Sequence, residues 1–600
     1  MACLSLLGLF LVLVVSVFPP CYVHGISCIE TERIALLSIK AGIDHSNNQS
    51  LFSSWTGQDC CKWQGVSCDH ESRHVIKLDL RQYLSETYLL LSKPASKLNV
   101  SLVQLHHLKY LDLSMNNFNN SPIPDFIGSL ANLEHLDLSN TGFSGIIPHT
   151  FGNLSSLRYL DLNTYSNSII QASDLHWLSR MTSLHHLDLS GVDLSNIAGW
   201  LHEFNLLPFL VVLKLSDAGL QADAGGIHDT TPLHHLNLTS LRVLDLSGNY
   251  DLNITLLHWL FNLTGLVNLD LSSCFFYDKF PDIFGNMSSL RVLSLSTNCF
   301  DGVLPRSLGN LGSLERLDLS QNDFNGSIPE SLSNLTNLVY FNLYGNQVQG
   351  LMPANIGNLR NLQFLDLIGN KISGAIPESF GNLTLLQHFD GSGGNGLSGK
   401  LPETIGNLVH LQFLDLSHNA LAAAFGKALS GKLPESIGNL TQLQQLRMPG
   451  NGIMGGLPES AGKLSSLWEL DLSGNNINGT LPKGMGKPLF HNLPVECWDG
   501  ETLETITSNF GNLIKVDEFT STLARSKYAR VCIEIDLSKP LCRGFWIGDD
   551  FQRVFVVVMY ERLPTFCYNC GLIGHGSKSC TRVALSGAGG FSLPSREERE

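Results

Sequence analysis

Leucine alternates with polar residues at a fixed spacing along most of this chain. The segment LERLDLSQNDFNGSIPESLSNLTN, residues 314–337, is followed by similar segments that begin at Leu338, Leu362 and Leu386, a period of 24 residues. In LDLS the two leucines point to one side of a short strand and the residues between them point to the other side. Sixteen such segments begin at Val75 (a degenerate copy), Leu108, Leu133, Leu157, Leu184, Leu210, Leu241, Leu266, Leu290, Leu314, Leu338, Leu362, Leu386, Leu411, Leu443 and Leu467.

The polar residues after each strand indicate how the segments join. A single segment cannot bury its leucine face, so the segments must stack to form a common core. An asparagine follows many of the strands, as at Asn322, Asn346 and Asn370. We expect each amide to be buried at a turn and to bond backbone groups of neighbouring coils, because buried polar groups need partners. The next Gly-x-Ile-Pro ends the strand and turns the chain, so the pattern predicts a solenoid.

This repeat resembles the plant-specific leucine-rich repeats over about residues 75–487. The resemblance implies an α/β solenoid with a parallel sheet on its concave face. The stretch CIETERIALLSIKAGID…SSWTGQDCCKWQGVSC resembles the N-terminal cap of that family, and this implies Cys28–Cys60 and Cys61–Cys68 disulfides. The block DLHWLSRMTSLHHLDLSGVDLSNIAGWLHEF is similar to receptor-like proteins of the fungal-xylanase-receptor type. That similarity implies recognition of extracellular elicitors, by binding of a peptide, protein or glycan, together with a co-receptor kinase.

Composition and the N-terminus favour the secretory pathway. Charged residues are 15% of the chain and the formal net charge is −15, which excludes a nucleic-acid binder that uses the whole surface. MACLSLLGLFLVLVVSVFPP predicts a signal peptide over residues 1–25, with an uncleaved anchor as the alternative. No later segment reaches the length of a membrane span. The thirteen Asn-x-Ser/Thr glycosylation sites are Asn48, Asn99, Asn119, Asn153, Asn237, Asn253, Asn262, Asn286, Asn325, Asn334, Asn382, Asn439 and Asn478.

Aromatic residues recur at one outward position of the strands. Tyr340, Phe364, His388 and Phe413 occupy it in four successive repeats, and an earlier run has Tyr110, His135, Tyr159 and His186. On a concave sheet these runs would form two aromatic ladders, which are candidate anchors for a ligand. The alternative is that an aromatic ring simply suits a strand. The paired histidines, such as 185–186, point apart on a strand and are not expected to bind metal. No catalytic constellation is present, so we expect no enzyme.

The pattern changes at about residue 488. CIEIDL and FVVVMY predict strands, and ETLETITSNFGNLIK predicts a helix. Cys567, Cys570, His575 and Cys580 then follow the spacing Cys-x2-Cys-x4-His-x4-Cys. Three thiolates and one imidazole can bind one zinc ion in a tetrahedral shell. Such zinc knuckles bind single-stranded nucleic acid, and the candidate contacts are Tyr568, Ile573, Lys578 and Arg582.

Residues 490–581 resemble a gag-like region of plant non-LTR retrotransposons, in which a domain of unknown function precedes the knuckle. Residues 527–582 contain eight basic and five acidic residues, which predicts weak nucleic-acid binding. The expected domains are a signal peptide at 1–25, a cap at 26–70, repeats at 71–487, a partial retrotransposon-type domain at 488–563, the knuckle at 564–581 and a disordered tail at 582–600.

Two classes of function compete, an extracellular recognition module and an intracellular zinc-dependent nucleic-acid binder. The disulfide cap requires an oxidising compartment and the knuckle requires reduced thiols. We therefore expect either a receptor-like gene joined to transposon sequence or a gene model that merges two reading frames. RNA reads that cross the codon of Lys487 would distinguish a real junction from a merged one.

Overall fold

A computed structural model describes most of the chain. The described residues are 28–43, 52–81, 97–164, 169–221, 237–252, 259–277, 279–419, 428–478 and 482, with the helix and strands between 487 and 561 that are given below. The chain divides into two compact units, Met1–Asp251 and Leu252–Glu600.

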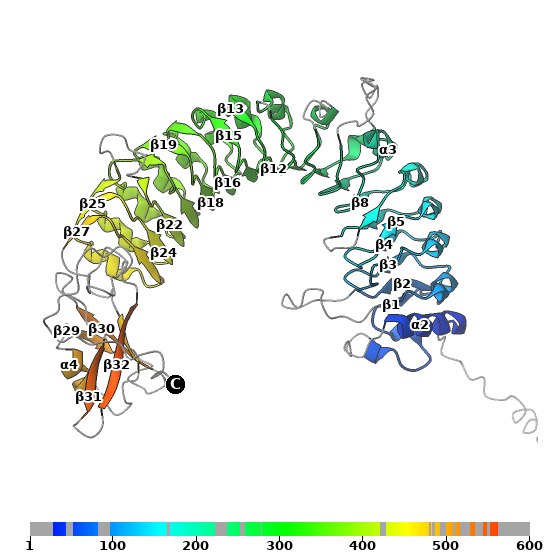
Figure 1. The fold of residues 1–600 in the computed structure, drawn as a ribbon, viewed down its shortest axis with the longest axis horizontal. Coiled ribbons are helices and arrows are strands. Elements are labelled where there is room, and N and C mark those ends of the chain that lie inside the picture. Colours follow the sequence, from blue (N-terminus) through cyan, green and yellow to red (C-terminus); the bar gives the residue numbers. More distant parts are fainter. Residues whose placement is uncertain are drawn as a thin grey trace, which may run out of the picture. The chain divides into compact units, whose positions relative to one another are not determined.

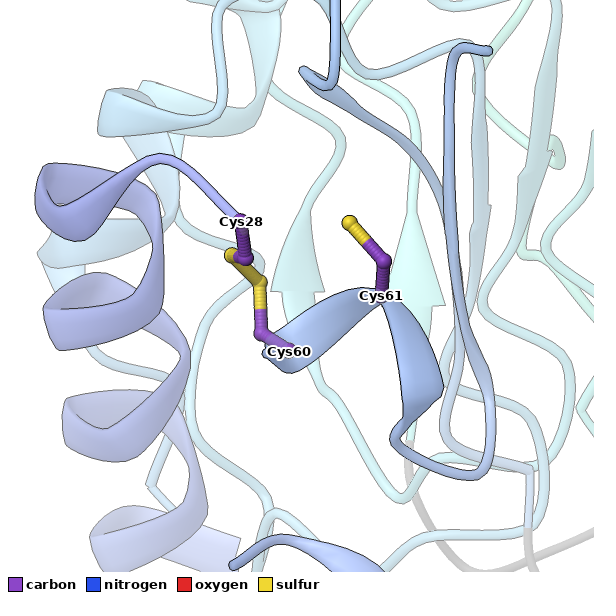
Figure 2. A group of neighbouring side chains, drawn as sticks. All are labelled: Cys28, Cys60 and Cys61. Carbon is purple, nitrogen blue, oxygen red and sulfur yellow. A yellow bond between two sulfur atoms is a disulfide. The ribbon is translucent and has the colours of Figure 1, made fainter. Parts of the chain in front are cut away.

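The first unit begins with the predicted disulfide cap. Helix α2 (Glu30–Ile43) buries Leu36 and Ile39 completely, and the 3-10 helices η1 (Phe52–Ser54) and η2 (Cys60–Lys62) follow. Both predicted disulfides, Cys28–Cys60 and Cys61–Cys68, are formed, with Cα separations of 5.3 and 5.4 Å. Figure 2 shows Cys28 bonded to Cys60, with the sulfur of Cys61 nearby and not bonded to either of them. The prediction of the cap pairing is therefore confirmed.

The cap continues directly into the repeat sheet. Strand β1 (Val66–Cys68) pairs antiparallel with β2 (Val75–Asp79). The buried carboxylate of Glu32 accepts a hydrogen bond from the backbone N–H of Val75 at 2.8 Å, which satisfies a donor at the end of the stack. The parallel strands of this unit then pair in the order β2, β3 (Tyr110–Asp112), β4 (His135–Asp137), β6 (Tyr159–Asp161), β8 (His186–Asp188), β9 (Val212–Lys214) and β10 (Val243–Asp245).

The second unit contains a second run of parallel strands. They pair in the order β11 (Asn268–Asp270), β12 (Val292–Ser294), β14 (Arg316–Asp318), β16 (Tyr340–Asn342), β18 (Phe364–Asp366), β20 (His388–Asp390), β22 (Phe413–Asp415), β24 (Gln445–Arg447) and β26 (Glu469–Asp471). Each of the sixteen predicted segments contains one of these parallel strands in the described part of the chain. Within each unit the strands line the inner side of the curve made by the repeats (Figure 1). We call this side the inner face.

Leucine and asparagine stack behind the sheet as expected. In one repeat Leu314, Leu317 and Leu319 are fully buried. The amide of Asn346 donates to the carbonyl oxygens of Leu319 and Leu343 at 2.9 and 3.0 Å, and its Oδ1 accepts from the backbone N–H of Phe324 at 3.1 Å. One side chain thus bonds three backbone groups, and the two carbonyl oxygens are shared with the amides of Asn322 and Asn370 in the neighbouring repeats.

The asparagine position is not uniform along the stack. Cys274 occupies it in the repeat of β11, and its backbone N–H donates to Oδ1 of Asn298 at 3.0 Å. In the first unit Thr141, Val192 and Ala218 occupy the same place. All of these side chains are buried. The position is therefore always buried in these repeats, whether or not its side chain is an amide.

A short 3-10 helix forms the outer side of each coil. Most of these helices follow a proline, as η13 follows Pro377, because the fixed φ of proline suits a helix start. They are η3 (Val100–Gln104), η4 (Asp125–Ser129), η5 (His149–Asn153), η6 (His176–Arg180), η7 (Leu238–Ser240), η9 (Asp282–Asn286), η10 (Arg306–Asn310), η11 (Glu330–Asn334), η12 (Ile356–Asn358), η13 (Glu378–Asn382), η14 (Glu403–Asn407), η16 (Glu435–Asn439) and η17 (Glu459–Lys463); α3 (Trp200–Phe204) is a short α-helix in the first unit.

Short strands precede the Gly-x-Ile-Pro turns, where the sequence analysis expected only a turn. Gly374 in this layer adopts a φ of 80°, a backbone conformation that favours glycine over residues with a Cβ. The paired groups are β5 (Gly145–Ile146) with β7 (Ile170–Gln171); β13 (Asp301–Val303) with β15 (Asp323–Asn325); β17 (Gln349–Leu351), β19 (Lys371–Gly374) and β21 (Gly396–Leu397); and β23 (Ser430–Gly431), β25 (Gly452–Gly455) and β27 (Asn476–Ile477).

The C-terminal segment forms a separate antiparallel sheet. Its order is β29 (Asn512–Val516), β30 (Tyr528–Glu534), β28 (Lys487–His491), β32 (Arg553–Glu561) and β31 (Gly544–Gly548). The expected strands at CIEIDL and FVVVMY fall within or at the end of β30 and β32. The expected helix over ETLETITSNFGNLIK is wrong in its second half, because α4 (Gly500–Thr507) ends early and β29 follows it.

Candidate functional site

Both predicted aromatic ladders are formed on the inner face. The C-terminal ladder comprises Tyr340, Phe364, His388 and Phe413, whose successive ring centroids are 4.4, 4.4 and 4.3 Å apart with interplanar angles of 5–9°. The N-terminal ladder comprises Tyr110, His135, Tyr159 and His186, with centroid separations of 4.1, 4.1 and 4.2 Å. The ladders form because the parallel strands are in register and place the same strand position side by side.

The stacking leaves ring edges, rather than ring faces, for a ligand. Each inner ring of a ladder is covered on both faces by its neighbours at stacking distance. Cations lie over the end rings too, and at the far end of the C-terminal ladder the guanidinium of Arg447 is 5.8 Å from the Phe413 ring centroid. The guanidinium of Arg316 lies 3.6 Å from the Tyr340 ring centroid, and the ammonium of Lys77 lies 4.3 Å from the centroid of Tyr110. The exposed edges carry the positive part of the aromatic quadrupole, so they favour contact with carbonyl and other polar oxygen atoms.

A row of acidic side chains runs beside the C-terminal ladder, two residues further along each strand. This acidic row comprises four aspartates, Asp318, Asp366, Asp390 and Asp415, and one neutral amide, Asn342. Its ends face cations, since Arg316 lies 3.6 Å from Asp318 and Arg447 lies 3.9 Å from Asp415.

The middle of the acidic row carries negative charge without an ion-pair partner among the described residues. Asp390 is 5% exposed, and its Oδ1 accepts from the backbone N–H of Ser392 at 3.0 Å. Burial, with repulsion from Asp415 and Asp366, raises the pKa of Asp390 to about 6. Burial likewise raises the pKa of Asp366. The sequence analysis missed this row, because in one repeat the aspartate of LDLS is only one of the residues that point away from the leucines.

Burial shifts the pKa values of side chains at the N-terminal ladder as well, and there it acts on both histidines and aspartates. Burial lowers the pKa values of His135 and His186 to about 4, so both imidazoles are neutral at pH 7. Burial and the nearby carboxylate of Asp188 raise the pKa of Asp161 to about 7. Neutral imidazole nitrogens therefore lie next to carboxylates on this part of the inner face.

Most predicted glycosylation sites have accessible side chains. Asn48 and Asn253 lie outside the described residues, and the other eleven asparagines are all exposed: Asn99, Asn119, Asn153, Asn237, Asn262, Asn286, Asn325, Asn334, Asn382, Asn439 and Asn478. Five of these are the last residue of an outer 3-10 helix: Asn153, Asn286, Asn334, Asn382 and Asn439. Glycans attached there would leave the inner face uncovered.

The knuckle and its predicted contacts lie outside the described residues. These are Cys567, Cys570, His575, Cys580, Tyr568, Ile573, Lys578 and Arg582. In the described part of the chain Cys28, Cys60 and Cys61 lie close together, but all three sulfurs are in disulfides and are not available as thiolate ligands. No helix of the described segments is long and apolar enough to cross a membrane.

Comparison with protein families agrees with this architecture. Residues 91–224 and 269–392 match the leucine-rich repeat region family, and residues 410–440 and 466–487 match the leucine-rich repeat family. Residues 29–69 match the leucine-rich repeat N-terminal domain, and residues 552–582 match the zinc knuckle family. The repeat solenoid, the disulfide cap and the separate C-terminal segment thus each have a counterpart.

Curated relatives are plant receptor-like proteins. The chain is 36% identical over 272 residues to receptor-like protein EIX1 of Solanum lycopersicum, an alignment that covers 44% of this chain and 26% of that protein. It is 36% identical over 267 residues to receptor-like protein EIX2 of the same species, covering 44% and 25%. The alignments therefore span about a quarter of the length of these relatives.

Solved receptor ectodomains share the fold. The ectodomain of the Arabidopsis receptor kinase HAESA, in complex with an extended IDA peptide hormone, has a TM-score of 0.54 and 26% identity, and the match covers 75% of this chain and 78% of that one. The plant peptide hormone receptor RGFR1 in complex with RGF2 has a TM-score of 0.53 and 26% identity, covering 70% and 65%.

The fold and the cap together define a leucine-rich repeat solenoid protein of the plant receptor type. The chain is a leucine-rich repeat protein whose repeats are similar to the receptor-like proteins EIX1 and EIX2, and its residues 552–582 match the zinc knuckle family.

Proposed function

We propose that this chain is a non-catalytic extracellular recognition module that binds a peptide or protein segment, such as part of a defence elicitor, along its inner face. The observation that carries the proposal is the C-terminal ladder with its acidic row, which together form a continuous aromatic and charged surface on β16, β18, β20 and β22. Two solved ectodomains of similar fold are in complex with peptide hormones, which supports a peptide ligand for this chain.

The ring arrangement favours a peptide over a glycan. Sugars bind aromatic side chains by lying flat on a ring face, and the inner rings of the ladder have no open face. Backbone carbonyls of an extended peptide can instead contact the ring edges. A lysine or arginine of the same peptide would then neutralise Asp366 and Asp390 at the middle of the acidic row.

The cap and the glycosylation sites support a secreted or cell-surface location. Disulfides persist in oxidising compartments, and the exposed asparagines can accept glycans there. We further propose a co-receptor kinase as partner, since the proposed function of the described repeats is recognition and a partner must transmit the signal.

The test is binding of the secreted full chain to a fungal xylanase and, separately, to xylohexaose. We expect xylanase to bind and Phe364→Ala to weaken its affinity at least tenfold, because the middle of the ladder is lost. Leu351→Ala is the matched control, since Leu351 is a 67% exposed apolar side chain on the short strand β17 instead of the inner face. Binding of xylohexaose alone, lost in Phe364→Ala, would contradict a peptide or protein ligand.

The zinc-knuckle match favours a second activity for the C-terminal segment. We propose that Cys567, Cys570, His575 and Cys580 bind one zinc ion, because three thiolates and an imidazole suit tetrahedral zinc. Tyr568 and Ile573 would stack on bases and Lys578 and Arg582 would contact phosphates, giving weak single-stranded nucleic-acid binding. The measurement is zinc content and binding of a single-stranded RNA 20-mer at two salt concentrations, with Cys567→Ser as the variant that loses both.

A further inference from the structure

Three potential metal ligands meet on the inner face of the first unit, outside the surface proposed to bind a peptide. They are Asp161 on β6 and His186 and Asp188 on β8, and one donor atom of each lies within 4.8 Å of the others. The side chains meet because β6 and β8 pair in register, with Tyr159 opposite His186 and Asp161 opposite Asp188. Adjacent strands therefore contribute a carboxylate each and one of them adds the imidazole.

The imidazole of His186 lies close to both carboxylates, and its Nε2 atom is free to bind a metal ion. Its Nε2 is buried and has no hydrogen-bond partner in the described part of the chain. A buried polar atom without a partner is costly, so an unexplained one calls for a reason. The ring is stacked on Tyr159 at 4.2 Å, and this fixes its plane.

The two carboxylates hold oxygen atoms beside that nitrogen. Asp161 accepts from the backbone N–H of Asn163 through Oδ1 at 2.9 Å, and Oδ2 is 3.2 Å from the hydroxyl of Tyr159. Asp188 is 1% exposed and accepts from the backbone N–H of Ser190 through Oδ1 at 3.0 Å. Two adjacent carboxylates repel each other, and a divalent cation between them would remove that repulsion.

One cation already reaches this site. The ammonium of Lys214 lies 3.2 Å from Oδ2 of Asp188, and the Lys214 side chain is 39% exposed. A lysine with that exposure can turn away to solvent when a divalent ion takes its place. A related group, Asp112, His135 and Asp137, lies on β3 and β4, and the Nε2 of His135 is likewise buried without a hydrogen-bond partner in the described part of the chain. There the guanidinium of Arg81 lies 3.3 Å from Asp112 and also donates to both oxygens of Asp79 at 2.9 and 2.7 Å, so it is held in place more firmly than Lys214.

We propose that Asp161, His186 and Asp188 form a binding site for one divalent transition-metal ion, with Nε2 of His186 and one oxygen of each aspartate as ligands. One nitrogen and two oxygens suit zinc, whose bonds to such ligands are about 2.0–2.2 Å long. Ligands of one tetrahedral ion lie about 3.5 Å apart, so the donors need to move together by about an ångström. The ion would join two neighbouring coils of the inner face.

The test is calorimetric titration of zinc into the secreted full chain in which Cys567, Cys570 and Cys580 are serine, so that the knuckle does not bind the probe. We expect one zinc ion per chain and an affinity at least tenfold weaker in His186→Ala. Lys214→Met should bind zinc more tightly than the parent, because it removes the competing cation.

Matched variants separate the site from its surroundings. His185→Ala removes the neighbouring histidine, which is exposed and whose Nδ1 is 2.6 Å from the carbonyl oxygen of Ser183, and it should change zinc affinity less than twofold. Asp161→Asn keeps the side-chain shape, removes one ligand charge and should also weaken zinc at least tenfold, which gives an answer if His186→Ala does not fold. Full-affinity zinc binding by both His186→Ala and Asp161→Asn, loss only in His135→Ala, or no binding by the parent would each overturn the proposal.

Discussion

Asp390→Asn tests whether the buried negative charge at the middle of the acidic row lowers the stability of the folded chain. The carboxyl has a pKa of about 6 in the folded chain against an ordinary value of 3.8, a difference of about 2 pH units. Each unit corresponds to about 1.4 kcal/mol, so ionisation destabilises the folded state by at most about 3 kcal/mol at pH 7.5. Asparagine fits this position, because Asn342 occupies it two repeats earlier and accepts from the backbone N–H of Tyr344 at 2.9 Å.

The sign follows from the raised pKa. Below pH 3.8 the carboxyl is protonated in both the folded and the unfolded chain, and its ionisation does not affect stability. Between pH 3.8 and about 6 the carboxyl ionises more readily in the unfolded chain, so the free energy of unfolding falls as pH rises and levels off above about pH 6. Asparagine does not ionise, so we expect Asp390→Asn to raise the free energy of unfolding by about 1–3 kcal/mol at pH 7.5 and by about 0.5 kcal/mol or less at pH 4.

The assay is urea denaturation of the parent and the variant at pH 4, 5.5 and 7.5, followed by circular dichroism. The control is Asp318→Asn, in which a carboxylate 3.6 Å from Arg316 is lost and no stabilisation is expected. An Asp390→Asn effect that is equal at pH 4 and pH 7.5 would refute the electrostatic reasoning. If the ligand places a cation beside Asp390, Asp390→Asn should bind that ligand about tenfold more weakly. The variant would then be more stable and bind less well, as is common for substitutions at binding sites.

Three further outcomes follow from the packing. Asn346→Ala leaves the buried N–H of Phe324 without its acceptor, while the carbonyl oxygens of Leu319 and Leu343 keep the amides of Asn322 and Asn370. It should destabilise the second unit by about 1–3 kcal/mol, with faster hydrogen exchange of the Phe324 amide as the local readout. Replacing Cys28 and Cys60 by serine removes a disulfide between residues 32 positions apart and should lower the free energy of unfolding by about 3 kcal/mol. Thermal denaturation measures the effect. Digestion of the secreted chain with an N-glycosidase should shift its mass by several glycans, and an unchanged mass would exclude modification of the eleven exposed asparagines.

The repeats were predictable because one local pattern recurs in every coil. The spacing of leucines gave each inner strand, and the in-register stacking of equivalent positions gave both aromatic ladders. The buried amide of Asn346 followed from the same reasoning, since a turn in a stacked coil must satisfy its backbone groups. The cap disulfides were correct on the resemblance alone.

The electrostatics of the inner face could not be obtained from one repeat. In a single strand Asp390 points away from the leucines, whereas in the folded chain it is 5% exposed and lies between Asp366 and Asp415 of the neighbouring strands. The potential ligands of the zinc site come from two strands 25 or more residues apart, so their meeting depends on register. The helix expected at 501–515 failed for a different reason: Asn512–Val516 pairs with β30, and that pairing overrides the local helical pattern.

The two ends of the chain make opposite demands on their surroundings. Cys28–Cys60 and Cys61–Cys68 are closed in the structure and connect helix α2 to the start of the sheet, so the solenoid is suited to an oxidising compartment. Zinc binding at the knuckle needs thiolates, which that compartment would convert to disulfides. The zinc site proposed at His186 uses no sulfur and is free of this conflict. Zinc measured on the secreted chain would therefore remain when the knuckle cysteines are serine, whereas zinc at the knuckle would be found only on chain kept in a reducing compartment.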